Sequence, residues 1–161
     1  MKTVAMIAAL AASTAALPAF AEGDPAEGED GFKRCKSCHM VVDGDNEILK
    51  GGRTGPNLFG IVGRQAGTVE DFNYGDDLVA AGEAGLVWDE ENLVAYMTDP
   101  TAFLREFLED DSARSKMTFK LRNGGEDIVA FLASVAPDAG EGMEEGAEEE
   151  GEEAESTETS N

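Results

Sequence analysis

Both cysteines of the chain and its only histidine lie within five residues, in the stretch CKSCH at positions 35–39. A Cys-x-x-Cys pair serves three chemistries, namely a redox dithiol, half of a structural zinc site, or covalent attachment of haem. A structural disulfide between Cys35 and Cys38 is a further possibility, but it would close a very small loop and leave His39 without a role. Whatever fold the chain adopts must be built around this short segment.

The rest of the sequence decides between these chemistries. A thiol–disulfide enzyme usually places its cysteines at a helix start after a strand, whereas here the pair ends a predicted helix and no strand is evident. A zinc site needs four ligands, and Cys35, Cys38 and His39 are all the Cys and His residues of the chain. Cys-x-x-Cys-His is the signature of haem c attachment, in which two thiols bind the porphyrin and the histidine binds iron. The motif predicts one covalent haem c.

The N-terminal residues predict export. Residues 1–21 combine Lys2, an uncharged apolar run and an Ala-x-Ala arrangement at Ala19 and Ala21, which fits a cleaved signal peptide. The run is rich in Ala, Ser and Thr and contains Pro18, so it is a poor membrane anchor. We therefore expect a mature protein outside the cytoplasm, without stable membrane insertion.

The other end of the chain is an acidic tail. Residues 138–161 contain eleven acidic residues, no basic residue and no apolar periodicity, so we expect them to be disordered. Residues 22–137 remain, which is enough for one domain with one core. The formal net charge of −22 argues against nucleic acid as a partner.

The sequence of this domain predicts an all-α architecture of short helices joined by long glycine-rich loops. Apolar periodicity and capping residues predict helices over 24–38, 75–84, 88–98 and 125–135, with a short helical turn after Pro100. Residues 40–73 are rich in Gly and have no sustained period, so we interpret them as loops. Loops of this length bury little apolar surface. A bound haem would supply the missing core.

Iron bound by His39 needs a sixth ligand or an open site, and the candidates are methionines. Met40 is adjacent to His39 and cannot reach the opposite face of a haem, while Met143 lies in the acidic tail. Met97 lies on the apolar side of a predicted helix, where a core role is expected. Met117 lies in the irregular, polar stretch SKMTFK. We assign the sixth ligand to Met117.

Several motifs in order resemble those of class I cytochromes c, above all the bacterial cytochrome c2 and c550 type. They are CKSCH, TGPNLFGIVGR, FNY, a Trp eight residues before a Tyr, and KMTF. The resemblance covers about residues 23–136. Compared with the mitochondrial pattern, one residue fewer separates Phe32 from Cys35, and the loops at 41–53 and 102–115 are longer.

The resemblance implies a role for further residues. The Pro56 carbonyl would accept a hydrogen bond from His39, and the Tyr96 hydroxyl would approach the sulfur of Met117. Gly28 and Phe32 would lie where the first helix crosses the last. Three side chains would donate hydrogen bonds to the haem propionates, namely Arg64, Tyr74 and Trp88. The aromatic ring of Phe119 would shield the haem edge.

Basic residues gather around the two predicted iron ligands. Seven of the eleven basic residues outside the signal peptide lie there: Lys33, Arg34, Lys36, Arg114, Lys116, Lys120 and Arg122. We name them the basic cluster and expect them to steer the haem edge toward acidic partners.

The resemblance implies a monomeric periplasmic one-electron carrier rather than an enzyme. The family's partners are a cytochrome bc1 complex as donor and a cytochrome c oxidase or photosynthetic reaction centre as acceptor. The alternative is a haem enzyme or sensor, peroxidase-like, in which Met117 dissociates to open the iron.

Overall fold

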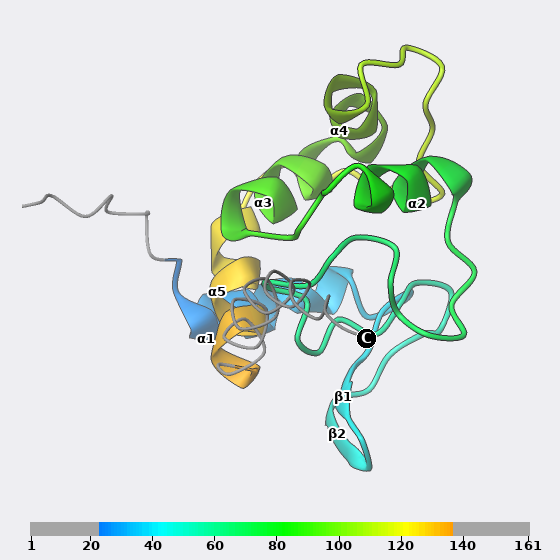
Figure 1. Cartoon of the computed structure of the whole chain (residues 1–161). Coiled ribbons are helices and arrows are strands. Elements are labelled where there is room, and N and C mark those ends of the chain that lie inside the picture. The colour runs from blue at the N-terminus through cyan, green and yellow to red at the C-terminus, as the bar shows by residue number, and fades with distance from the viewer. Residues whose placement is uncertain (1–22, 137–161) are drawn as a thin grey trace, which may run out of the picture.

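Two helices from opposite ends of the described chain, α1 (Pro25–Gly31) and α5 (Gly125–Val135), cross in contact (Figure 1). The computed structural model describes residues 23–136, so the predicted signal peptide and acidic tail lie outside the described residues. A Cβ atom on Gly28 would lie 2.8 Å from Cβ of Phe131, so only glycine allows this approach. The rings of Phe32 and Phe131 are 5.9 Å apart. The predicted crossing at Gly28 and Phe32 is present.

The first helix leads directly into CKSCH. Asp24 caps α1 by accepting hydrogen bonds from the N–H groups of Ala26 (2.8 Å) and Glu27 (3.4 Å). The predicted helix is interrupted, because α1 gives way to a 3-10 turn, η1 (Phe32–Arg34). The cysteine motif continues this turn, and the N–H of His39 donates to the carbonyl of Cys35 at 2.9 Å.

Three helices cover the other side of the molecule, as Figure 1 shows: α2 (Asp76–Glu83), α3 (Glu90–Thr98) and α4 (Pro100–Phe107). The first two match the predicted helices closely. The short turn predicted after Pro100 is an eight-residue helix. Asp99 separates α3 from α4 and caps α4 through the N–H of Ala102 (3.2 Å).

A β-hairpin corrects the prediction that residues 40–73 are loops and that the domain lacks strands. Strands β1 (Val41–Asp43) and β2 (Asn46–Leu49) pair antiparallel, and Gly44 occupies the left-handed region in their turn (φ 56°). Asn57 holds β1 on its other side, accepting from the N–H of Val42 (3.0 Å) and donating to its carbonyl (2.7 Å). Strands of three and four residues are too short to show a period, although Gly-Asp, here Gly44-Asp45, is a typical two-residue hairpin loop.

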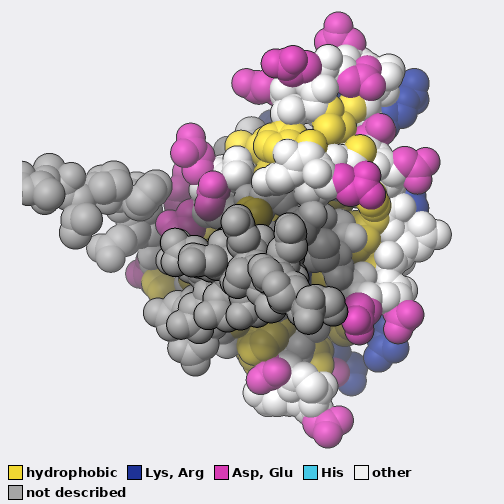
Figure 2. All heavy atoms as spheres, in the orientation of Figure 1, with side chains coloured by type: hydrophobic (Ala, Val, Ile, Leu, Met, Phe, Trp, Pro, Cys, Tyr) yellow, Lys and Arg dark blue, Asp and Glu magenta, His cyan; other side chains and the backbone are white. Residues whose placement is uncertain are grey.

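Apolar side chains form the core, and acidic side chains lie on the surface. The core is formed by apolar side chains from η1, β1, the four helices α2 to α5 and the loops, with Phe32, Val41 and Leu104 fully buried. Figure 2 shows acidic side chains spread over the visible face of the described elements. None of the helices in residues 23–136 has the length and apolar character that crossing a membrane requires.

Candidate functional site

A cavity of about 390 Å³ lies between the cysteine motif and the helices that cover it. Its walls come from every part of the domain and are mostly apolar, including side chains of α3 and α5. The predicted site residues that line it are Cys35, Cys38, His39, Pro56, Tyr74, Trp88, Tyr96, Met117 and Phe119. The fold thus brings together residues that are up to 84 positions apart in the chain.

The His39 imidazole is held by a single well-placed hydrogen bond. Nδ1 lies 2.9 Å from the Pro56 carbonyl oxygen, so this nitrogen donates and Nε2 keeps its lone pair. Burial lowers the pKa of His39, which favours the neutral ring that a metal needs. The contact expected between His39 and Pro56 is therefore present, and it leaves one nitrogen available as a ligand.

Three glycines let the following loop pack directly against the motif. A Cβ atom on Gly55 would lie 2.6 Å from His39 Nδ1 and 2.7 Å from Nε2, so the ring rests on the bare backbone of this residue. A Cβ atom on Gly51 would lie 2.7 Å from the His39 carbonyl carbon, and one on Gly52 would lie 2.9 Å from that of Ser37. Sequence analysis did not single out these residues, although the glycine-dense stretch KGGRTGP was the available signal.

The two thiols line the same cavity in different surroundings. Cys35 is half-buried, and burial raises the pKa of its thiol. Cys38 is exposed, and hydrogen bonds from Thr54 and Ser37 lower the pKa of its thiol. No disulfide joins the two cysteines. Both sulfurs are available to form bonds with a group in the cavity.

Met117 lies in an irregular stretch, residues 115–120, which we name the Met117 segment. Its side chain is half-buried, and its N–H donates to Ser115 Oγ at 3.1 Å. The Lys116 ammonium donates to the carbonyls of Tyr74 (2.7 Å) and Asn73 (3.0 Å), which joins the segment to the loop before α2. Met97, predicted as core, packs against the core and also lines the cavity.

The aromatic residues around the cavity form a connected group, with Trp88 and Tyr96 rings 5.0 Å apart. The Tyr96 hydroxyl pairs with Ser115 Oγ at 2.8 Å, two residues before Met117. A hydroxyl both donates and accepts, so Ser115 can bond to Tyr96 and to the Met117 N–H at once. Phe119 is 45% exposed beside the cavity.

Arg64, which the resemblance assigns to a haem propionate, bonds to the main chain in this structure. Its guanidinium donates to the carbonyls of Phe59 (3.0 Å) and Asn57 (3.1 Å), and the side chain does not line the cavity. The planar fork of a guanidinium suits two neighbouring carbonyls, so the loop itself takes up this side chain. In this structure Arg64 holds the cavity wall from behind.

The basic cluster is exposed, but much of it already has partners within the chain. Arg34 reaches the Asn123 carbonyl and side chain at 3.4 Å. Ion pairs join Lys33 to Asp30 (2.7 Å) and Lys120 to Asp99 (2.5 Å). Within residues 23–136, ion pairs of this kind are absent for the remaining members Lys36, Arg114 and Arg122, while Lys116 bonds to carbonyls as described above.

Comparison with known proteins places this geometry in a family. The chain is 63% identical over 136 residues to cytochrome c-551 of Roseobacter denitrificans, covering 84% of this chain and 96% of that protein. It belongs to the class I cytochromes c. Within that family it is of the bacterial cytochrome c2 and c-550 type. A cytochrome c2 of Rhodobacter capsulatus is 52% identical over 136 residues, with 84% of this chain and 98% of the relative covered.

Solved structures confirm the class I cytochrome c fold. Ferric cytochrome c-550 of Paracoccus versutus aligns with a TM-score of 0.70 at 50% identity, covering 72% of this chain and 100% of that one. Cytochrome c2 of Rhodobacter capsulatus aligns with a TM-score of 0.69 at 53% identity, covering 70% and 98%. A scan against protein-family models found no match.

As a class I cytochrome c, the protein carries one covalent haem c and is an electron carrier. The site fits this group. One cavity presents two thiols that no disulfide joins, an imidazole with a free nitrogen, and mostly apolar walls. When bound, the haem supplies an iron that cycles between Fe(III) and Fe(II).

Proposed function

We propose that this cytochrome is a periplasmic one-electron carrier whose haem is held by four side chains. Cys35 and Cys38 form the two thioethers, His39 binds iron on one face and Met117 on the other. One observation carries the proposal: a single cavity is lined by both thiols, by an imidazole oriented through Pro56, and by the Met117 side chain. Thioether ligation favours Fe(II), and mostly apolar cavity walls do the same.

Other residues around the cavity orient the His39 ring, hold the haem propionates or cover the haem edge. The Pro56 carbonyl fixes the His39 ring and increases its donor strength. Tyr74 and Trp88 line the cavity and offer polar hydrogens to the haem propionates, whereas Phe119 covers the haem edge. With His39 and Met117 both holding the iron, substrates would not reach it. The protein is therefore a carrier and acts as a monomer between its partners.

The same proposal divides the chain into three parts. Residues 1–21 are a signal peptide removed on export, residues 22–137 are the cytochrome domain, and residues 138–161 are an acidic tail. Support comes from the sequence of the first part and the composition of the last. Electrons pass from a cytochrome bc1-type donor to a terminal oxidase or a photosynthetic reaction centre, and the basic cluster docks on both.

Carbon monoxide tests whether the iron is closed. We expect the reduced protein to bind carbon monoxide slowly and incompletely, because Met117 occupies the position that the gas would take. Optical titration of the purified protein under a carbon monoxide atmosphere measures this. Prompt and complete binding would instead identify a haem enzyme or sensor with an open iron.

Charge reversal tests docking by the basic cluster. Lys36 suits the test because it is exposed and its change leaves the internal contacts of Lys116 and Lys120 intact. We expect Lys36→Glu to slow reduction by a cytochrome bc1 complex about tenfold at low ionic strength, and the difference to vanish at high salt. Stopped-flow rates across a salt series measure both effects.

A matched control separates position from net charge. Ala80→Glu combined with Ala84→Glu lowers the net charge by two, as Lys36→Glu does, but on exposed residues of α2 and its C-cap. We expect this pair to slow the reaction much less than Lys36→Glu. Equal slowing by the two proteins would show that only overall charge matters and that the basic cluster does not dock.

A further inference from the structure

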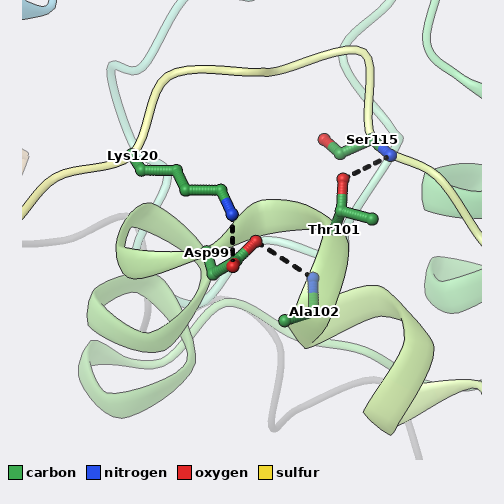
Figure 3. A network of polar contacts seen from close by, with 5 residues as sticks. All are labelled: Asp99, Thr101, Ala102, Ser115 and Lys120. Atoms are coloured by element: carbon green, nitrogen blue, oxygen red, sulfur yellow. Dashed lines mark hydrogen bonds and ion pairs between the residues drawn. The ribbon is translucent and has the colours of Figure 1, made fainter.

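The first turn of α4 contacts both ends of the Met117 segment. Asp99 Oδ2 lies 2.5 Å from Lys120 Nζ at one end, and Thr101 Oγ1 accepts from the Ser115 N–H at 3.4 Å at the other. Figure 3 shows these two contacts side by side, with Asp99 also bound to the N–H of Ala102. Met117 lies between the two points of attachment.

Further hydrogen bonds hold the backbone on both sides of Met117. Ser115, held by Thr101, accepts from the N–H of Met117 and pairs with the Tyr96 hydroxyl. Beyond Lys120, the N–H of Leu121 donates to the Met97 carbonyl at 2.8 Å. Movement of Met117 away from the cavity would therefore disturb contacts on both sides of it.

The first turn of α4 is a rigid support for these contacts. Pro100 and Leu104 are fully buried, which anchors the helix in the core. Asp99 is oriented by its capping bond, so its carboxylate is in place before Lys120 binds. The hydrogen bond from Lys120 lowers the pKa of Asp99, so the carboxylate is charged at neutral pH. This helix contains residues 102–107, the first part of the stretch 102–115 that is longer than the mitochondrial pattern.

We propose that Asp99 and Thr101 are positioning residues for the sixth iron ligand, and that α4 clamps the Met117 segment over the haem. The inference rests on the proposed ligation by Met117. In the ferric protein the clamp lowers the fraction of molecules in which Met117 has left the iron. Lys120 acts through Asp99 in this role, in addition to any part it takes in docking.

Imidazole added to the ferric holoprotein measures this fraction, because it binds iron only where Met117 has left. Asp99→Asn keeps a capping residue while it removes the charge, and Lys120→Met removes the ammonium. We expect each to bind imidazole about two- to fivefold more tightly than the unchanged protein, the range that an exposed ion pair supports. Lys120→Arg, which retains the pair, restores the original affinity.

The control and a double variant make the test specific. Lys50→Met removes the exposed pair between Lys50 and Glu47 (3.6 Å) on the hairpin, and we expect no change in imidazole affinity. Asp99→Asn combined with Lys120→Met should match either single change, because both remove one interaction. If the α4 variants behave like Lys50→Met, or if Lys120→Arg fails to restore the affinity, the clamp is overturned.

Failure of the clamp and failure of the ligand assignment give different results. Met117→Leu, measured alongside, should bind imidazole far more tightly than any clamp variant. If Met117→Leu changes nothing, Met117 is not the ligand and both proposals fall. If Met117→Leu binds tightly while Asp99→Asn and Lys120→Met remain at the control value, only the clamp falls.

Discussion

Replacing Met117 by leucine should convert a closed haem into an open one. Leucine fills similar space but has no donor atom, so the sixth position passes to water or to an added ligand. A minor open state of about 0.1–10% becomes the whole population, so the apparent affinity of the ferric protein for imidazole should rise roughly 10- to 1000-fold. The reduction potential should fall, since thioether ligation favours Fe(II). Optical titration with imidazole and redox titration measure the two effects.

Met97 provides the matched control for this prediction. It is a second half-buried methionine that lines the same cavity, but it lies within α3 and its carbonyl is bound by Leu121. Met97→Leu should leave both imidazole affinity and the spectrum of thioether-ligated iron close to those of the unchanged protein. The opposite result, with loss of the thioether signature in Met97→Leu alone, would move the sixth ligand to residue 97.

Adding one methyl group at Gly55 should have the second large effect. The Cβ atom of an alanine would overlap the His39 ring, which is held between the Pro56 carbonyl and the cysteine motif. Because the ring is fixed by its hydrogen bond to Pro56 and, as proposed, by the iron, we expect a loss of about 2–3 kcal/mol in the free energy of unfolding. The melting midpoint of the holoprotein should fall by roughly 10 °C, as followed by visible circular dichroism.

Gly44→Ala is the appropriate comparison for this change. Gly44 lies in the hairpin turn at φ 56°, and a Cβ atom there meets nothing within 4 Å. Its cost is confined to left-handed backbone strain of about 1 kcal/mol, with an unaltered haem spectrum. Should Gly55→Ala be as mild as Gly44→Ala, the loop would have room to move and the tight packing described for His39 would be wrong.

The residues proposed to bind the haem could be selected from the sequence because of their chemistry. Cys35, Cys38, His39 and Met117 were selected because few side chains bind porphyrin or iron, and the structure places all four around one cavity. Helices were predicted where caps and apolar periods agree, as with Asp89 at the start of α3, which accepts from the Asn92 N–H at 2.7 Å.

Sequence could not predict contacts that depend on which partner lies nearby in space. A guanidinium has many possible acceptors, and Arg64 binds two loop carbonyls that its sequence position does not reveal. Ser115 has no sequence signal of its own, yet it pairs with the Tyr96 hydroxyl. The hairpin was missed because Val41–Asp43 is too short for alternation to be visible.

Different kinds of contact hold the two sides of the site in place. Gly51, Gly52 and Gly55 bring main chain against main chain and against the imidazole, so any side chain added there is blocked at once. Across the cavity, the Met117 segment is secured by exchangeable pairs such as Asp99 with Lys120. Directed evolution of this cytochrome would therefore find graded changes in ligand lability among residues 99–120, and all-or-nothing losses among residues 51–55.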